Sequence, residues 1–169
     1  KCGIEWIDPS DPIFKWIDFM FHKTRASNHS NLGKMRVSNV YKLIRDNEHD
    51  IFMEAAERIA KNSIHKRNDL PDVYKPIWNE RLKEDKQYED LMERANILPL
   101  YHGSKTCNFV KILPTQLKLP RNNFTISGAM FSGGAGGLYF ASNASKSCQY
   151  SSTANSFYSK GNDNKGYLF

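Results

Sequence analysis

The sequence is poor in cysteine and has no long apolar run. Its 169 residues include three cysteines, Cys2, Cys107 and Cys148, at wide and unrelated spacings. This number and spacing fit neither a disulfide framework nor a zinc site, so we expect a reducing intracellular compartment, the cytoplasm or the nucleus. No apolar stretch approaches the roughly 20 residues that a membrane-spanning helix needs, and residues 1–6 lack a basic-then-apolar leader. We therefore expect no membrane association and a start that lies inside a longer protein.

Acidic residues are scarce in the last part of the chain. The last glutamate is Glu93, and Asp163 is the one acid that follows it. The whole chain carries 24 Lys and Arg against 18 Asp and Glu, a net charge of +6, which favours the approach of phosphate-bearing ligands. The basic residues are scattered among acidic ones, however, and no nucleic-acid-binding motif is recognisable. A solvated basic surface is the simpler interpretation.

The patterning predicts one globular domain over residues 1–169, because 40% of the residues are apolar and 12% aromatic. A first helix is expected from Asp11 as cap and Pro12 as first residue, followed by a loop over residues 23–34 and a strand over residues 35–44. Asn47 is expected to cap a second helix. Its predicted core stripe is Ile51, Phe52, Ala55, Ala56, Ile59 and Ala60. Residues 62–96 are dense in charge and predict a helical excursion rather than a second domain.

The stretch from residue 101 to residue 150 carries the candidate site. It predicts, in order, strand, polar turn, helix, long loop, strand and helix, with an apolar run over residues 97–101 leading into the first turn. Gly103 would let a flat amide ligand reach the backbone N–H and C=O, because no Cβ intervenes. Asn108 lies one helical turn beyond Ser104. Ser147 and Tyr150 are three residues apart on the last helix, so a hydroxyl and an aromatic ring would share one face.

A glycine-rich segment and two histidines invite comparison with a phosphate-binding loop and a metal site, but neither has the pattern that such a site requires. The glycine-rich residues 133–137 lack the Gly-Lys-Ser/Thr ending and the six-residue dinucleotide fingerprint, so a lid or hairpin connection is the better interpretation. His22 and His29 have no further residues near them at ligand spacing. We therefore predict no metal site.

Several ordered motifs together resemble the catalytic domain of the poly(ADP-ribose) polymerase family, the diphtheria-toxin-like ADP-ribosyltransferases with a His-Tyr-Glu signature. The motifs are His102-Gly103-Ser104 with Asn108-Phe109, Gly128-Ala129-Met130-Phe131, Gly137-Leu138-Tyr139-Phe140-Ala141, and Ser145-Lys146-Ser147 with Tyr150. Residues 24–29 and 37–44 are also similar to the family's region between its first helix and first strand. The similarity is weakest over residues 62–96.

The resemblance implies an α+β ADP-ribosyltransferase fold in which split antiparallel or mixed β-sheets form an NAD cleft with flanking helices. It implies an enzyme that transfers ADP-ribose from NAD+ to a macromolecular acceptor, protein more than nucleic acid, and releases nicotinamide. His102 would hold the adenine-side ribose, with Ser104 and Asn108 nearby. The backbone of Gly103 and the hydroxyl of Ser147 would bind the nicotinamide carboxamide.

The remaining roles also follow from the resemblance. Tyr150 would stack under the nicotinamide ring and Tyr139 would form the opposite wall. His102 and Tyr139 would be the first two members of the catalytic signature. Lys118 and the loop over residues 120–128 match the family's donor loop, which covers the adenosine and the pyrophosphate.

Three departures from the family pattern stand out. Ala129 replaces an aromatic residue of many members, the glycine loop is longer than usual, and Pro99 interrupts a strand that ordinarily lacks proline. The largest departure is the catalytic glutamate, which in the family lies well beyond the second tyrosine and is absent here. A carboxylate stabilises the oxocarbenium-like transition state, and losing one such electrostatic partner costs roughly 3 kcal/mol or more. We therefore expect a poor catalyst, and a chain that ends before the final strands.

An alternative stays open at this point. The same pocket could serve a catalytically inactive module that binds NAD or ADP-ribose or contacts a partner. The sequence decides neither the acceptor, nor the choice between one ADP-ribose unit and a polymer, nor the oligomeric state.

Overall fold

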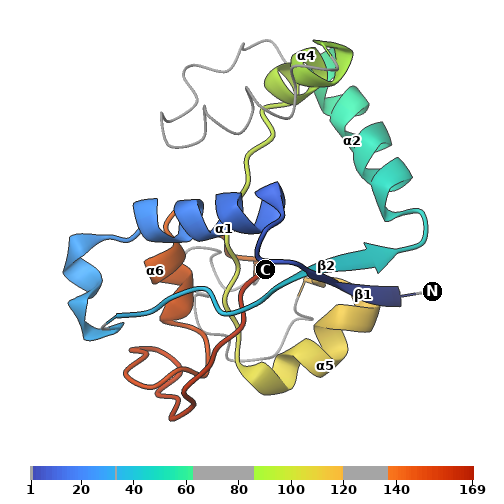
Figure 1. Ribbon diagram of the computed structural model, residues 1–169. Coiled ribbons are helices and arrows are strands. Elements are labelled where there is room, and N and C mark those ends of the chain that lie inside the picture. The colour runs from blue at the N-terminus through green and yellow to red at the C-terminus, as the bar shows by residue number, and fades with distance from the viewer. Residues whose placement is uncertain (1, 33, 63–85, 120–136) are drawn as a thin grey trace. The chain divides into compact units, whose positions relative to one another are not determined.

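A computed structural model describes residues 2–32, 34–62, 86–119 and 137–169 (Figure 1). The chain divides into two compact units, one made of Lys1–Lys23 and Ser38–Pro99 and the other of Thr24–Val37 and Leu100–Phe169. The first unit holds strands β1 (Cys2–Ile7) and β2 (Val40–Arg45) and helices α1 (Pro12–Lys23), α2 (Glu48–Asn62) and α4 (Lys86–Arg94). The second holds the 3-10 helix η1 (Ser27–Leu32) and helices α5 (Thr106–Thr115) and α6 (Ala144–Cys148).

Strands β1 and β2 form an antiparallel pair that runs from Cys2 opposite Arg45 to Ile7 opposite Val40. The predicted strand over residues 35–44 is therefore too long at its start. Its partner stops at Ile7, because the next residues turn into α1 through an Asp11 N–H to Asp8 carbonyl hydrogen bond of 2.9 Å. Before Val40, no strand in the described parts of the chain pairs with this segment, and residues 35–39 are not in a strand.

The first predicted helix is confirmed as α1, including its cap. Pro12 is the first helical residue, and the Asp11 carboxylate accepts the Ile13 N–H at 2.7 Å. Met20 and Phe21 are buried. The cap thus satisfies one of the amide groups that every helix start leaves without an intrahelical partner.

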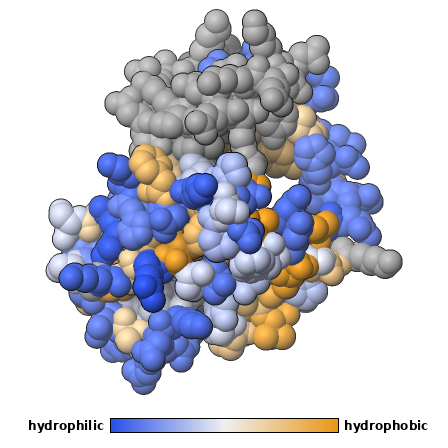
Figure 2. All heavy atoms as spheres, in the orientation of Figure 1, coloured by the Kyte–Doolittle hydropathy of each residue, from blue (hydrophilic) through white to orange (hydrophobic). Residues whose placement is uncertain are grey.

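Helix α2 packs against α4, but the predicted core stripe is only partly right. Ala56 and Ala60 are buried with Leu91 and Ala95 of the α4 region, with Met53 and Ile97 alongside. Three members of the stripe are largely exposed, Ile51 at 59%, Phe52 at 41% and Ile59 at 50%. The contact runs along the narrow alanine side, where two helices approach closely. The larger apolar side chains stay exposed, and on the face of the molecule that Figure 2 shows, apolar residues lie among hydrophilic ones.

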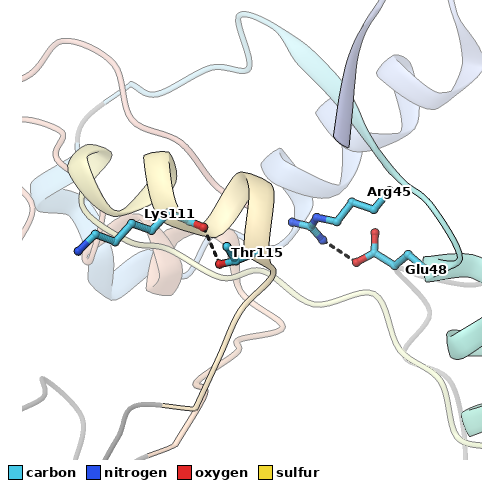
Figure 3. Close-up of polar contacts among 4 residues, drawn as sticks. All are labelled: Arg45, Glu48, Lys111 and Thr115. Carbon is cyan, nitrogen blue, oxygen red and sulfur yellow. Dashed lines mark hydrogen bonds and ion pairs between the residues drawn. The ribbon is translucent and has the colours of Figure 1, made fainter. Parts of the chain in front are cut away.

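The start of α2 is fixed by β2. Arg45 ends the strand, and its guanidinium forms an ion pair of 2.5 Å with Glu48, the first residue of α2 (Figure 3). Asn47, the predicted cap, has a positive φ of 61°, and its carbonyl accepts the Ile51 N–H at 3.0 Å. The part of the predicted excursion before α4, with Ile77, Trp78 and Leu82, lies outside the described residues.

The second unit has short helices and single bridges where strands were predicted. The predicted loop over residues 23–34 contains η1, which has a kink at His29. The helix after the polar turn is confirmed as α5, and near its end Thr115 donates to the Lys111 carbonyl at 2.7 Å (Figure 3). The predicted strands around residues 101 and 139 are reduced to isolated antiparallel bridges, Tyr101 with Ala141 and Gly103 with Leu168.

These observations support the α+β class at a coarse level, since the described residues form helices and one small antiparallel sheet. No continuous strand forms around residue 101, because Tyr101 pairs with Ala141 while the next two residues pair with a different segment, Leu168 and Phe169. Among the described residues, no helix is both long and apolar enough to cross a bilayer.

Candidate functional site

The backbone at residues 101–103 pairs alternately with two different segments. Tyr101 exchanges hydrogen bonds with Ala141 at 2.8 and 2.9 Å, and His102 exchanges them with Phe169 at 2.9 and 3.0 Å. In extended backbone, successive residues direct their N–H and C=O groups to opposite sides. Gly103 therefore directs both groups to the same side as Tyr101, where neither has a hydrogen-bond partner in the described parts of the chain. This leaves an adjacent donor and acceptor, which suits a planar amide.

Ser147 lies directly against Gly103. A Cβ built on Gly103 would lie 1.8 Å from the Ser147 carbonyl oxygen, so only glycine fits without displacing α6. Ser147 is 4% exposed as a residue, and its hydroxyl donates to the Tyr101 carbonyl at 3.0 Å. Because the single hydroxyl hydrogen is used there, the oxygen can still accept a hydrogen bond from a ligand N–H.

His102 and Tyr139 are joined through the backbone. The His102 ring nitrogen Nδ1 lies 2.8 Å from the Tyr139 carbonyl oxygen, which can only accept, so Nδ1 must carry a hydrogen. In the neutral ring, Nε2 is then an acceptor that can receive a hydroxyl hydrogen. Phe140 packs beside the imidazole with ring centroids 5.5 Å apart, which fixes the ring further.

Tyr150 presents a half-buried ring just past the end of α6. Its N–H donates to the Ser147 carbonyl at 3.1 Å, which keeps it close to Gly103. One face of the ring stacks on Tyr158, with centroids 4.6 Å apart and planes 15° apart. Burial raises the pKa of Tyr150, Lys146 opposes this rise, and the neighbouring Tyr158 and Tyr139 add to it.

Ser104 and Asn108 form a pair at the start of α5, as their spacing predicts. The Asn108 side-chain amide donates to the Ser104 hydroxyl at 2.9 Å. Lys118 is exposed, and within the described ranges no hydrogen bond or ion pair joins it to the other candidates. The predicted donor loop over residues 120–128 and the glycine-rich residues 133–136 lie outside the described residues.

Residues 26–31, which include most of η1, are joined to the α6 region by hydrogen bonds of polar side chains. The Ser145 hydroxyl accepts the Ala26 N–H at 2.9 Å and lies 2.9 Å from His29 Nδ1. The side-chain amides of Asn31 and Gln149 bond reciprocally at 3.0 and 3.1 Å. In the part of the chain that the structure describes, no three His, Cys, Asp or Glu side chains gather as a metal site would require.

Comparison with known proteins now decides the family. Residues 13–160 match the family described as the poly(ADP-ribose) polymerase catalytic domain. The chain belongs to this family.

Three poly(ADP-ribose) polymerases align with parts of the chain. Poly [ADP-ribose] polymerase 1 of Gallus gallus is 36% identical over 75 residues, which cover 44% of this chain and 7% of that protein. Poly [ADP-ribose] polymerase of Sarcophaga peregrina is 31% identical over 114 residues, 66% of this chain and 11% of that protein. Poly [ADP-ribose] polymerase 1 of Danio rerio is 34% identical over 86 residues, which cover 51% of this chain and 8% of that protein. The chain thus spans about a tenth of the curated relatives that it matches.

As a member of the poly(ADP-ribose) polymerase family, the chain is expected to have the ADP-ribosyltransferase fold. The structure brings together His102, Gly103, Tyr139, Ser147 and Tyr150, and it places Ser104 and Asn108 in contact with each other. It does not join Lys118 to them in the described parts. The role of each residue toward NAD+ stays a prediction.

Sequence reasoning missed two residues that shape this site. Tyr158 covers one face of Tyr150, and Gln149, 3% exposed, holds the turn that carries Tyr158. The Ser- and Asn-rich composition of residues 151–164 suggested only a polar tail. A buried glutamine beside a candidate tyrosine has no sequence signature, because its partners are far away along the chain.

Proposed function

We propose that this chain binds the nicotinamide end of NAD+ between Gly103, Ser147 and Tyr150. The observation that carries the proposal is the Gly103 backbone. Its N–H and C=O face one side without partners in the described chain, next to the Ser147 hydroxyl and the Tyr150 ring. Membership of the poly(ADP-ribose) polymerase family supports NAD+ as the substrate.

Each atom in this arrangement has a chemical role in the proposal. The Gly103 N–H donates to the carboxamide oxygen, and its C=O accepts from the carboxamide nitrogen. The Ser147 oxygen accepts the second amide hydrogen, while its own hydrogen stays on the Tyr101 carbonyl. The face of Tyr150 that Tyr158 does not cover stacks on the nicotinamide ring, with Tyr139 as the opposite wall.

The remaining candidates extend the proposal toward the rest of NAD+. His102 Nε2 accepts a hydrogen from a hydroxyl of the adenine-side ribose, because Nδ1 is held by the Tyr139 carbonyl. Ser104 and Asn108 lie beside that ribose. Lys118 acts with the donor loop on the adenosine and pyrophosphate.

The reaction that we propose is transfer of ADP-ribose to a macromolecular acceptor, a protein more than a nucleic acid. The acceptor forms a bond to the ribose carbon that carries nicotinamide. Nicotinamide leaves with the electrons of the broken bond and becomes neutral, and the acceptor's proton passes to a base. A carboxylate must stabilise the positive charge on the ribose, and the chain has no glutamate after Glu93. Binding of NAD+ is therefore the part of the function that these residues supply themselves.

The finer architecture belongs to the same proposal. We infer one catalytic domain over residues 1–169, whose split sheets form the NAD+ cleft. We also propose an intracellular, reducing compartment, to which the three cysteines without disulfide bonds correspond.

Calorimetry with nicotinamide and with NAD+ tests the proposal. The 169-residue chain should bind both, and Tyr150→Ala should weaken nicotinamide binding on the order of ten- to a hundredfold, because stacking on one base is worth roughly 1–3 kcal/mol. Tyr41→Ala is the matched control. Tyr41 is an exposed tyrosine, at 53%, and it belongs to the first unit.

Two results would contradict the proposal. One is the absence of heat from either ligand with the wild-type chain. The other is an equal loss of affinity in Tyr150→Ala and Tyr41→Ala, since that would place the ring of Tyr150 outside the binding site.

A further inference from the structure

The ring of Tyr158 stacks on one face of the Tyr150 ring. The two rings are nearly parallel, at 15°, with centroids 4.6 Å apart, a distance at which aromatic pairs attract each other. On Tyr158 itself, the Lys146 ammonium lies 5.3 Å from the ring centroid, and the Phe157 ring contacts it edge-on at 5.0 Å. Tyr158 is 47% exposed, and these contacts with Tyr150, Lys146 and Phe157 fix the plane of its ring.

The turn that carries Tyr158 is anchored to one buried side chain. The Gln149 carbonyl accepts the N–H groups of Tyr158 and Ser159 at 3.1 and 3.3 Å. Its side-chain oxygen accepts the N–H of Phe157 at 2.8 Å, and Asn31 bonds the same amide. Gln149 directly precedes Tyr150 in the chain. The position of Tyr158 relative to Tyr150 is therefore set by hydrogen bonds within residues 149–159 and by the bonds of Asn31 to the Gln149 side chain.

Hydroxyl groups hold the far side of the same turn. Ser159 donates to the Ser151 carbonyl and its hydroxyl contacts that of Ser156. Ser151 is 1% exposed and Ser156 3% exposed, so these bonds are protected from water. A turn with this many internal bonds can carry an aromatic ring in one position at a low entropic cost.

We propose that Tyr158 is a positioning residue for the nicotinamide site. This role rests on the proposed function. The stack of Tyr158 on Tyr150 leaves one face of the Tyr150 ring for the ligand and fixes the tilt of that face. Without Tyr158, the Tyr150 ring would be free to turn about its side-chain bonds. Ligand binding would then have to order the ring, and this loss of conformational entropy would weaken the binding.

The test compares Tyr158→Phe, Tyr158→Leu and Tyr158→Ala by calorimetry with nicotinamide. Tyr158→Phe should bind within about twofold of the wild type, because it keeps the ring. Tyr158→Leu and Tyr158→Ala should bind roughly two- to tenfold more weakly, as expected when one aromatic contact is lost. Leu keeps apolar bulk, so it stays informative if Ala disturbs the turn. Tyr41→Ala again serves as control.

A second measurement needs no ligand. Proton NMR of the ligand-free chain should show the Tyr150 ring with shifted resonances in wild type and Tyr158→Phe, owing to the neighbouring ring. In Tyr158→Leu those resonances should move toward the values of a mobile tyrosine. A change of these resonances that occurs in Tyr158→Leu and not in Tyr158→Phe therefore reports the loss of the ring at position 158.

The outcomes separate the two ideas. If the wild type does not bind nicotinamide, the proposed function fails, while the ligand-free spectra still test the stack. If the wild type binds and Tyr158→Leu binds equally well, the positioning role alone is overturned. Equal weakening by Phe and Leu would also overturn it, because the hydroxyl and not the ring would then matter.

Discussion

At the scale of single residues, Gly103 determines the backbone geometry of the candidate site. Its missing side chain has two effects: the Ser147 carbonyl can approach its Cα, and a ligand can reach its N–H and C=O. The first effect is geometric, since a Cβ would lie 1.8 Å from that oxygen, well inside any allowed contact. The second depends on the alternation of the backbone between Ala141 and Phe169.

Replacing Gly103 should therefore destabilise the fold and the site together. Gly103→Ala should lower the free energy of unfolding by roughly 1–3 kcal/mol, as overpacking does, and it should abolish nicotinamide binding. Gly3→Ala is the matched control, because its new Cβ would be 3.8 Å from Ile44 Cβ, an ordinary contact. Urea unfolding followed by circular dichroism measures the free energy of unfolding of both variants, and calorimetry measures their nicotinamide binding. A Gly103→Ala chain as stable as Gly3→Ala would show that α6 moves aside without penalty.

At the scale of elements, short polar contacts determine where helices begin and which segments they join. Asp11 fixes the start of α1, and Glu48 with Arg45 marks the start of α2. In the second unit, α6 has five residues, too few to be stable alone. The bonds from Ser145 and Gln149 to residues 26–31 hold it in place, so the candidate site depends on hydrogen bonds between segments about 120 residues apart.

The cap of α1 gives a prediction at this scale. Asp11→Ala should lower the free energy of unfolding by about 1 kcal/mol, because the Ile13 N–H loses its acceptor. Asp18→Ala removes an aspartate from the same helix that only pairs with exposed His22 at 3.4 Å, and it should cost a few tenths of a kcal/mol. Thermal or urea unfolding of the two variants compares them. Equal losses would mean that the cap contributes no more than a surface ion pair.

At the scale of the whole molecule, the candidate site belongs to one compact unit and the two-stranded sheet to the other. All candidate residues from His102 to Tyr150 belong to the second unit. The first unit carries exposed Ile4, Trp6, Tyr41 and Ile44 on its two-stranded sheet. Its hollow of about 420 Å³ is lined by residues of β2 and the start of α2, among them Lys42, Arg45, His49 and Phe52. None of the candidate residues lines this hollow.

Ligand binding should therefore protect the two units unequally. A ligand at one hundred times its dissociation constant stabilises the form it binds by about 2.7 kcal/mol. We expect saturating nicotinamide to slow amide hydrogen exchange around Tyr101 and Ser147, and to leave exchange in β1 and β2 much less changed. Exchange measured by mass spectrometry resolves the two units. Stronger protection in β1 and β2 than around Ser147 would place the ligand elsewhere.

The sequence by itself determined the family, the start of α1, the Ser104 and Asn108 pair and the order of the candidate site residues. These features depend on motif identity or on local rules, such as a cap beside Pro12 or the spacing of four residues between Ser104, which precedes α5, and Asn108 in its first turn. The sequence also predicted a ligand beside Gly103, because a glycine after an apolar run allows close approach, and this role stays a prediction.

Only the tertiary structure decided the rest. Residues 101–103 form bridges instead of a strand, Ile51, Phe52 and Ile59 stay exposed, and Tyr158 lies behind Tyr150. Each outcome depends on which distant segment supplies a partner: Ala141 and Phe169 for the backbone, the narrow α4 contact for the alanines of α2, and Gln149 with Asn31 for the turn of Tyr158. Periodicity states which face of an element is apolar, but partners far along the chain determine how much of that face is covered.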